Sequence, residues 1–293
     1  MSTHDPWQQD QSAGYDSAVE RFNKMSLEEA GIVHESGASI LLGHGRRTSR
    51  AFVLLHGTTN SPFQWLEFAR ILFELGHNVF VPRAPYHGLR SGQVKELAPL
   101  KAADLHAYTV DALNTGLALG HDLILIGISG GGTVAAWAAQ NRSDNGRTVL
   151  AMPFLGLYGW PLSLSPALMK FFARLPDFSL AKPSEPRRSW VYHGQSSHGV
   201  VAYLSLAVDV LRGAREGKAP KGQAIIFTKG GDRQVNNKAT NDLAGLWRQA
   251  GAEIVKHDFP RELGFAHNPA DPAADPVKRE LFYQKVLELL GEG

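Results

Sequence analysis

The sequence predicts an α/β fold in which a mostly parallel β-sheet is covered by helices on both faces. Short apolar runs of strand length alternate with amphipathic helical patterns along most of the chain, which is the signature of such a sheet. The run Ala51–Leu55 is apolar at every position, as expected of a parallel strand buried on both sides. With 293 residues, of which 43% are hydrophobic and 20% charged, the chain can bury a sizeable core.

The N-terminal region differs from the rest in being polar. Residues 1–28 read as an arm with one short helix, Tyr15–Met25, because Val19 and Phe22 lie three positions apart between charges. The two short runs that follow, GIVHE and ASILLG, are separated by a Ser-Gly turn. They predict a hairpin of edge strands.

From residue 51 onward each strand is followed by a helix. Ser61 and Pro62 supply an N-cap and a first-turn proline for a helix that continues to Leu75, where Gly76 ends it. The remaining strands are predicted at 77–81, 123–126, 148–152, 224–227 and 253–257, and the remaining core helices at 101–119, 131–140, 237–249 and 276–290.

Residues 157–221 interrupt this alternation and are predicted to form a helical cap, or lid, inserted into a core of residues 29–156 and 222–293. One helix begins at Ser165-Pro166 and a second covers about Val200–Leu211. Each shows one apolar stripe, formed by Leu168, Phe171, Phe172 and Leu175 in the first and by Val200, Leu204, Ala207 and Leu211 in the second. The stripe of the first helix, with Trp160 and Phe178, either lines an acyl pocket or simply packs the cap onto the core. We expect Trp160, Phe171 and Phe172 to contact substrate.

Composition narrows the possible partners. Thirty basic and 28 acidic residues, without a basic block, argue against nucleic acid. The absence of cysteine excludes disulfides, thiol nucleophiles and Cys-ligated metals. The sequence as given begins without a signal peptide and has no apolar run long enough for a spanning helix, so we expect a cytoplasmic protein with no stable membrane insertion. The oligomeric state is not indicated.

The segment Gly127-Ile128-Ser129-Gly130-Gly131 carries the strongest chemical signal. It places a G-x-S-x-G sequence between an apolar strand and an Ala-rich helix, which is the context of a nucleophile elbow. The tight turn requires glycine two residues on either side of Ser129. At the helix N-terminus, free N–H groups and the helix dipole favour developing negative charge.

An oxyanion hole needs a second donor besides the N–H of Gly130. His56-Gly57-Thr58-Thr59 follows the strand at 51–55, where a turn can direct a backbone N–H toward the same point. Its position in this turn favours Thr58 as the second donor, with Thr59 as the alternative. His56 is interpreted as a structural residue.

A nucleophilic serine needs a histidine base and a carboxylate that orients it. Of the twelve histidines, His267 is the one that follows the last strand and lies in a loop, whereas His257 falls inside that strand. Asp232 follows a strand at its carboxyl end and is the favoured acid, with Asp258 and Glu262 as rivals. The other histidines precede Ser129 or lie in the insertion; they are His4, His34, His44, His56, His77, His87, His106, His121, His193 and His198.

The segments LLHGTTNSP, NVFVPRAPYHG, LIGISGGG, FTKGGD and GFAHN, in this order and spacing, resemble the α/β-hydrolase superfamily, and within it the serine aminopeptidase and monoacylglycerol-lipase-like esterases. The resemblance runs from about residue 30 to the end. It implies hydrolysis of small-molecule carboxylic esters by a serine esterase through an acyl-enzyme, without a cofactor. The alternatives are a thioesterase or amidase with the same triad, or a ligand-binding protein on this fold with little or no catalysis.

Metal and nucleotide sites are not indicated. His193 and His198 are loosely spaced, with no acidic neighbour that would complete a metal site. The chain also lacks a P-loop and an acidic residue placed for a dinucleotide fingerprint.

Overall fold

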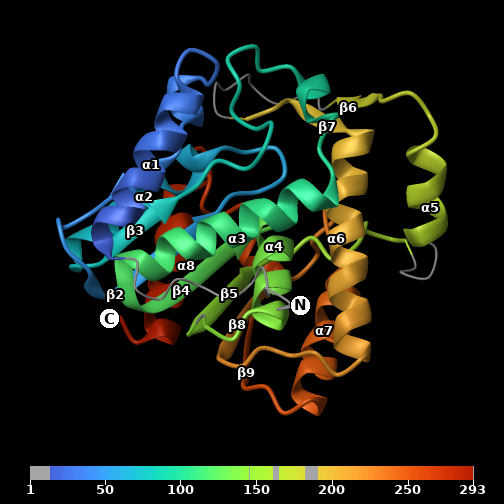
Figure 1. Ribbon diagram of the computed structural model, residues 1–293. Coiled ribbons are helices and arrows are strands. Elements are labelled where there is room, and N and C mark those ends of the chain that lie inside the picture. The colour runs from blue at the N-terminus through green and yellow to red at the C-terminus, as the bar shows by residue number, and fades with distance from the viewer. Residues whose placement is uncertain (1–13, 145, 161–164, 182–190, 293) are drawn as a thin grey trace, which may run out of the picture.

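The computed structural model describes residues 14–144, 146–160, 165–181 and 191–292, and has a seven-stranded sheet at its centre (Figure 1). The strand order is β1-β3-β2-β4-β5-β8-β9, and each neighbouring pair is parallel except β1 with β3. The predicted, mostly parallel sheet is therefore confirmed. Its strands are β1 (Ile40–Leu42), β2 (Thr48–Leu55), β3 (Asn78–Val81), β4 (Gly120–Ile128), β5 (Arg147–Ala151), β8 (Gln223–Lys229) and β9 (Ile254–Phe259).

Helices cover both faces of the sheet, because alternate residues of each buried strand point in opposite directions. Val53 and Leu55 of β2 belong to the apolar cluster on one face, and Phe52 and Leu54 belong to the cluster on the other. The first cluster includes residues of α1 (Tyr15–Glu29), α3 (Ala102–Leu119), α4 (Gly130–Asn141), α6 (Ser197–Arg215) and α7 (Asn237–Gln249). The second includes residues of α2 (Leu66–Glu74) and α8 (Pro276–Leu290).

The N-terminal part of the core differs from the sequence prediction. The segment GIVHE forms no strand; only Val33 makes an isolated bridge, to Leu89, and β1 pairs with β3 instead. The predicted hairpin is therefore wrong, because β1 completes its hydrogen bonds at the edge of the central sheet. Helix α1 contacts α3, and Ala18 is buried in the core, so the boundary expected after residue 28 falls inside α1.

The helix expected from Ser61 begins with a 3-10 turn, η2 (Pro62–Trp65), before α2. Ser61 makes no side-chain capping bond, since its hydroxyl donates to the carbonyl oxygen of Ser36 at 2.8 Å. Ser61 therefore occupies the predicted N-cap position, with Pro62 in the first turn, but its side chain does not cap the helix.

The region between β5 and β8 contains α5 (Ser165–Phe172), α6 and a two-stranded sheet of β6 (Ser179–Ala181) and β7 (Gly194–Ser196). Helix α6 lies against α4, α3 and α7, while α5 contacts α6 on the side away from the central sheet (Figure 1). Leu168, which was predicted in the apolar stripe of α5, lies outside the residues whose side chains the structure describes. Of the helices in the described parts of the chain, none is both long and apolar enough to cross a membrane.

Candidate active site

Ser129 occupies the sharp turn between β4 and α4, with φ 54° and ψ −117°. A non-glycine residue adopts this conformation only where its surroundings enforce it. They do so here, because a Cβ on Gly127 would lie 2.1 Å from the Gly131 carbonyl oxygen, and one on Gly131 would lie 2.2 Å from that of Leu55. The glycines two residues before and after Ser129 therefore allow the turn, as the sequence motif predicts.

Ser129, His267 and Asp232 form a continuous hydrogen-bonded series. The Ser129 Oγ lies 2.9 Å from His267 Nε2, and His267 Nδ1 lies 2.8 Å from Asp232 Oδ2. A carboxylate only accepts, so Nδ1 carries the hydrogen and Nε2 is left to accept from the serine hydroxyl. All three residues are buried, with 6%, 6% and 4% of their surfaces exposed, respectively. The structure thus brings together the three residues that the sequence selected.

Asp232 follows β8 and is held as an ionised acceptor. Burial raises the pKa of this carboxyl, but the hydrogen bond from His267, together with that from the Gln234 N–H, outweighs burial and leaves the pKa lowered. Because β2, β4 and β8 are parallel, the segments that follow them meet at one edge of the sheet. This arrangement explains how residues so distant in sequence converge.

The rival acids lie elsewhere. Asp258 is in β9, where it contacts Thr228 and Lys256. Glu262 is exposed in the 3-10 turn η5 (Arg261–Leu263). His257 is also in β9, opposite Phe227 in the sheet register. None of these residues makes a hydrogen bond to the triad among the described contacts.

The two residues expected to form the oxyanion hole are neighbours. A Cβ on Gly130 would lie 2.4 Å from Thr58 Cγ2 and 2.9 Å from Tyr203 Cε1, so Thr58, Gly130 and the α6 residue Tyr203 meet at one point. Gly130 opens α4, and its N–H has no partner within the helix. Thr59, the alternative donor, also borders the cavity described below.

Hydrogen bonds fix the carbonyl oxygens of the loop that contains Thr58. His56 Nδ1 lies 3.0 Å from Gly57 O, His87 Nε2 lies 2.8 Å from Thr58 O, and the Tyr192 N–H donates to Thr59 O at 2.8 Å. In addition, the Gly57 N–H donates to Gln64 Oε1 at 2.9 Å. Fixing the carbonyls fixes the peptide planes, and with them the direction of the N–H groups.

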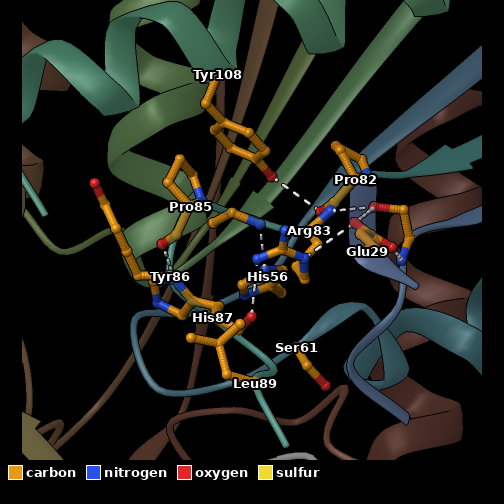
Figure 2. A network of polar contacts seen from close by, with 12 residues as sticks. Glu29, His56, Ser61, Pro82, Arg83, Pro85, Tyr86, His87, Leu89 and Tyr108 are labelled. Atoms are coloured by element: carbon orange, nitrogen blue, oxygen red, sulfur yellow. Dashed lines mark hydrogen bonds and ion pairs between the residues drawn. The ribbon is translucent and has the colours of Figure 1, made fainter. Parts of the chain in front are cut away.

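Two buried histidines support this loop (Figure 2). His56 Nε2 accepts from the Ala84 N–H at 3.0 Å, and His87 Nδ1 lies 2.8 Å from Pro85 O. Burial lowers the pKa of both imidazoles, that of His56 to well below its ordinary value. The neighbouring His87 lowers the pKa of His56 further, whereas hydrogen bonds to Pro85 O and Thr58 O oppose the effect of burial on His87. The sequence indicates a structural role for His56 but no role for His87, because nothing in the segment PYHG shows that His87 reaches Thr58.

A cavity of about 300 Å³ opens beside Ser129 and His267. Its polar lining consists of Thr58, Thr59, Asn60, Gln195, Gln234, Asn268 and Asp271, and its apolar lining of Phe154, Leu157, Val191, Val235, Ala266, Ala273 and Ala274.

Trp160, Phe171 and Phe172, the residues expected to contact substrate, are not among those that line this cavity. Phe171 is 58% exposed, and Trp160 is also exposed. The physical reason is that α5 packs on the outer side of α6 and does not extend over the carboxyl edge of the sheet (Figure 1).

No group of three or more metal-ligating side chains occurs within the described residues. His198 Nε2 lies 2.9 Å from Leu175 O, so this histidine joins α6 to the segment after α5. The structure therefore gives His198 a structural partner.

Comparison with solved structures shows the same fold at low sequence identity. A metagenome-derived lipolytic enzyme superposes with a TM-score of 0.67 at 19% identity, covering 89% of this chain and 100% of the other. A monoglyceride lipase from Saccharomyces cerevisiae gives 0.63 at 15%, with 87% and 92% covered. A monoacylglycerol lipase from Paleococcus ferrophilus gives 0.60 at 16%, with 87% and 98% covered. No curated protein sequence matches the chain.

The sequence itself matches a family model. The model describes the alpha/beta hydrolase family and aligns with residues 52–280. This range includes the second half of β2, the Ser129 turn, Asp232 and His267, and it covers most of the chain. The match agrees with the strand order, the resemblance seen in the sequence and the geometry at Ser129. The chain belongs to the alpha/beta hydrolase family.

Proposed function

We propose that the protein is a serine hydrolase that cleaves carboxylic esters through an acyl-enzyme intermediate. The observation that carries the proposal is the buried series from Ser129 Oγ through His267 to Asp232, with contacts of 2.9 and 2.8 Å. Three solved structures that share the fold belong to proteins named as a lipolytic enzyme, a monoglyceride lipase and a monoacylglycerol lipase. The names of these three proteins favour carboxylic esters, rather than other acyl compounds, as the substrates of this chain.

In the first step, the Ser129 oxygen attacks the ester carbonyl carbon while its proton moves to His267 Nε2. Asp232 keeps the imidazole in the correct tautomer and stabilises the imidazolium that forms. The carbonyl oxygen becomes an oxyanion, which accepts hydrogen bonds from the N–H groups of Thr58 and Gly130. The dipole of α4 adds favourable potential at the same point.

Collapse of this intermediate expels the alcohol, which takes the proton from His267 and leaves Ser129 acylated. Water then attacks the acyl carbon, giving its proton to His267, and the acid is released as Ser129 is restored. The net reaction consumes one ester and one water and yields one acid and one alcohol. No metal or cofactor enters this scheme.

A fluorophosphonate probe tests the nucleophile, because an activated serine displaces fluoride from its phosphorus. Wild type is expected to be labelled and to hydrolyse p-nitrophenyl butyrate, and Ser129→Ala to do neither. A folded wild type that is neither labelled nor active would contradict the proposal and favour a ligand-binding protein.

The acid and base are tested separately. We expect His267→Ala to leave only the roughly 10³–10⁴-fold acceleration over water that the oxyanion hole and binding supply. Asp232→Asn is expected to lower the rate about 10⁴-fold by favouring the wrong tautomer. Asp258→Asn is the matched control and should keep wild-type turnover; the reverse result would move the acid to Asp258.

A further inference from the structure

Residues 82–87, which follow β3, are anchored to helix α1 by a buried ion pair (Figure 2). Arg83 Nε donates to Glu29 Oε1 at 3.0 Å, and the two side chains are 15% and 5% exposed, respectively. The Ser39 N–H donates to Glu29 Oε2 at 2.9 Å and its hydroxyl to Glu29 Oε1 at 2.7 Å, while the Arg83 N–H donates to the Ser39 hydroxyl at 2.9 Å. Both carboxylate oxygens therefore have protein donors, as a stable buried ion pair requires.

The guanidinium of Arg83 also holds the main chain of His87. Arg83 Nη1 donates to the His87 carbonyl oxygen at 3.1 Å. In the His87 ring, Nε2 lies 2.8 Å from Thr58 O and Nδ1 lies 2.8 Å from Pro85 O. Carbonyl oxygens only accept, so a neutral ring can donate to just one of the two. The contact with Thr58 therefore depends on where the His87 main chain lies, and Arg83 fixes that position.

Both peptide planes next to Thr58 depend on residues 82–87. The Ala84 N–H donates to His56 Nε2 at 3.0 Å, so His56 Nδ1 carries the hydrogen that Gly57 O accepts at 3.0 Å. That bond fixes the plane that carries the Thr58 N–H, and the contact of the second histidine with Thr58 O fixes the plane that follows. A shift of this segment would therefore turn the Thr58 N–H away from the oxyanion.

We propose, on the basis of the proposed serine hydrolase function, that Glu29 and Arg83 are positioning residues for the oxyanion hole. Neither is among the described residues that line the cavity of the active site. They act through the two buried histidines on the direction of the Thr58 N–H. Helix α1, which ends at Glu29, precedes residues 52–280, so part of this chain outside the range of the family model supports the catalytic geometry.

The proposal predicts a loss in kcat with little change in KM, because the oxyanion exists only after attack on the carbonyl. We expect Glu29→Gln and Arg83→Met each to lower kcat for p-nitrophenyl butyrate by about 10- to 10²-fold, since a displaced donor costs less than a deleted one. KM should stay within about threefold of its wild-type value.

Glu292→Gln is the matched control, because Glu292 is also a buried acid in an ion pair. Its side chain is 8% exposed and contacts Arg50 and, at 2.9 Å, His77 Nε2. Arg50 is near the start of β2, whereas the Thr58 loop follows the other end of that strand. Urea denaturation measures the stability that each substitution removes. Under conditions in which both variants are folded, only Glu29→Gln should have a lower kcat.

A trifluoromethyl ketone with a butyl chain measures the oxyanion hole directly. Ser129 Oγ bonds to the ketone carbon and its proton passes to His267 Nε2, which leaves a hemiketal oxyanion bound by the same N–H groups as the reaction intermediate. We expect the inhibition constant to rise in Glu29→Gln by the factor by which kcat/KM falls. In Glu292→Gln both constants should keep their wild-type values, as they would in any variant that loses only stability.

Further variants test whether Arg83 acts as a bridge. Arg83→Lys keeps the positive charge, but one ammonium group does not reproduce the separate donors to Glu29 and to the His87 carbonyl, so kcat should fall to within about threefold of the Arg83→Met value. The double variant Glu29→Gln/Arg83→Met should lose no more activity than the single variants, because the two residues act in one series. Ser39→Ala removes only the hydroxyl that joins them and serves if the ion-pair variants do not fold; it should lower kcat by a smaller factor.

The outcomes separate the two proposals. A labelled, active enzyme whose kcat and inhibition constant are unchanged by Glu29→Gln, or by Ser39→Ala if that is the folded variant, would overturn the positioning role and leave the esterase function standing. Equal losses of kcat in Glu29→Gln and Glu292→Gln would assign the loss to stability and would also overturn it. A wild type that is neither labelled nor active would overturn both proposals.

Discussion

Helices α5 and α6 of the insertion look alike in the sequence but have different surroundings in the structure. Both show apolar residues at helical spacing, and both were expected to form the lid. In α6 the buried surface is wide, and Tyr203, Leu206 and Val210 are almost fully covered. In α5, Phe171 faces solvent over more than half of its surface.

An apolar stripe in the sequence therefore predicts a helix but not what that helix covers. Helix α6 has 19 residues and contacts α3, α4 and α7, whereas α5 has eight residues and lies on α6. A long helix with a broad apolar arc can be anchored to the core, while a helix of eight residues has less area to bury. Through Tyr203, α6 also reaches Gly130 at the start of the nucleophile helix.

The two helices should differ most in what they contribute to stability. We expect Leu206→Ala in α6 to lower the free energy of unfolding by about 2–5 kcal/mol, because a fully buried leucine leaves a cavity. Leu175→Ala, just after α5 and 37% exposed, should lower it by less than about 1 kcal/mol. Urea denaturation measures both. Equal losses would show that the segment after α5 is anchored as firmly as α6.

The next effect links α6 to catalysis. Gly130→Ala would place a methyl group against Thr58 and against the buried ring of Tyr203, which the packing of α6 prevents from retreating. We expect kcat to fall about 10²–10³-fold, the loss typical of one displaced oxyanion donor. Gly245→Ala in α7, where an added Cβ meets nothing within 4 Å, is the matched control and should retain turnover. Full activity of the Gly130 variant would mean that the added methyl group does not displace the Thr58 loop that lies between α6 and α4.

Most of the core could be predicted because local chemistry determines it. The Gly-x-Ser-x-Gly turn, the strand end before Asp232 and the loop position of His267 each follow from nearby residues, and the structure brings these residues together. The contact of His87 with Thr58 O could not be predicted, because it joins two loops whose relative position depends on the whole sheet. The predicted hairpin failed for a similar reason: β1 pairs with a strand distant in sequence.

A smaller effect concerns pH on the α6 side of the molecule, where His87 lies near Tyr203 with a ring separation of 6.3 Å. Burial lowers the pKa of His56 and, against the hydrogen bonds to Pro85 O and Thr58 O, also that of His87, so below pH ~6.5 the unfolded chain binds more protons at these two positions than the folded protein does. Stability is therefore present above that pH and is lost as the pH falls below it, by up to about 1.4 kcal/mol per pH unit for each histidine.

Urea unfolding at pH 7 and pH 5.5 measures this loss. Replacing His87 by Gln should flatten the dependence, because one of the two proton-binding differences is removed. An unchanged slope would show that the folded protein protonates His87 as readily as the unfolded chain does.

The smallest expected effect is that of Phe171→Ala in α5, and it decides whether this helix contributes to substrate binding. Phe171 is 58% exposed and does not line the cavity beside Ser129, so its removal should change the free energy of unfolding by less than about 1 kcal/mol and the butyrate-to-decanoate ratio of kcat/KM by less than twofold. Phe154→Ala is the matched comparison, because Phe154 is buried and lines the cavity; we expect a loss of about 3–5 kcal/mol and a changed ratio. If instead Phe171→Ala altered the chain-length preference while stability stayed constant, α5 would contact the acyl chain during turnover, and the acyl pocket predicted from its apolar stripe would be correct.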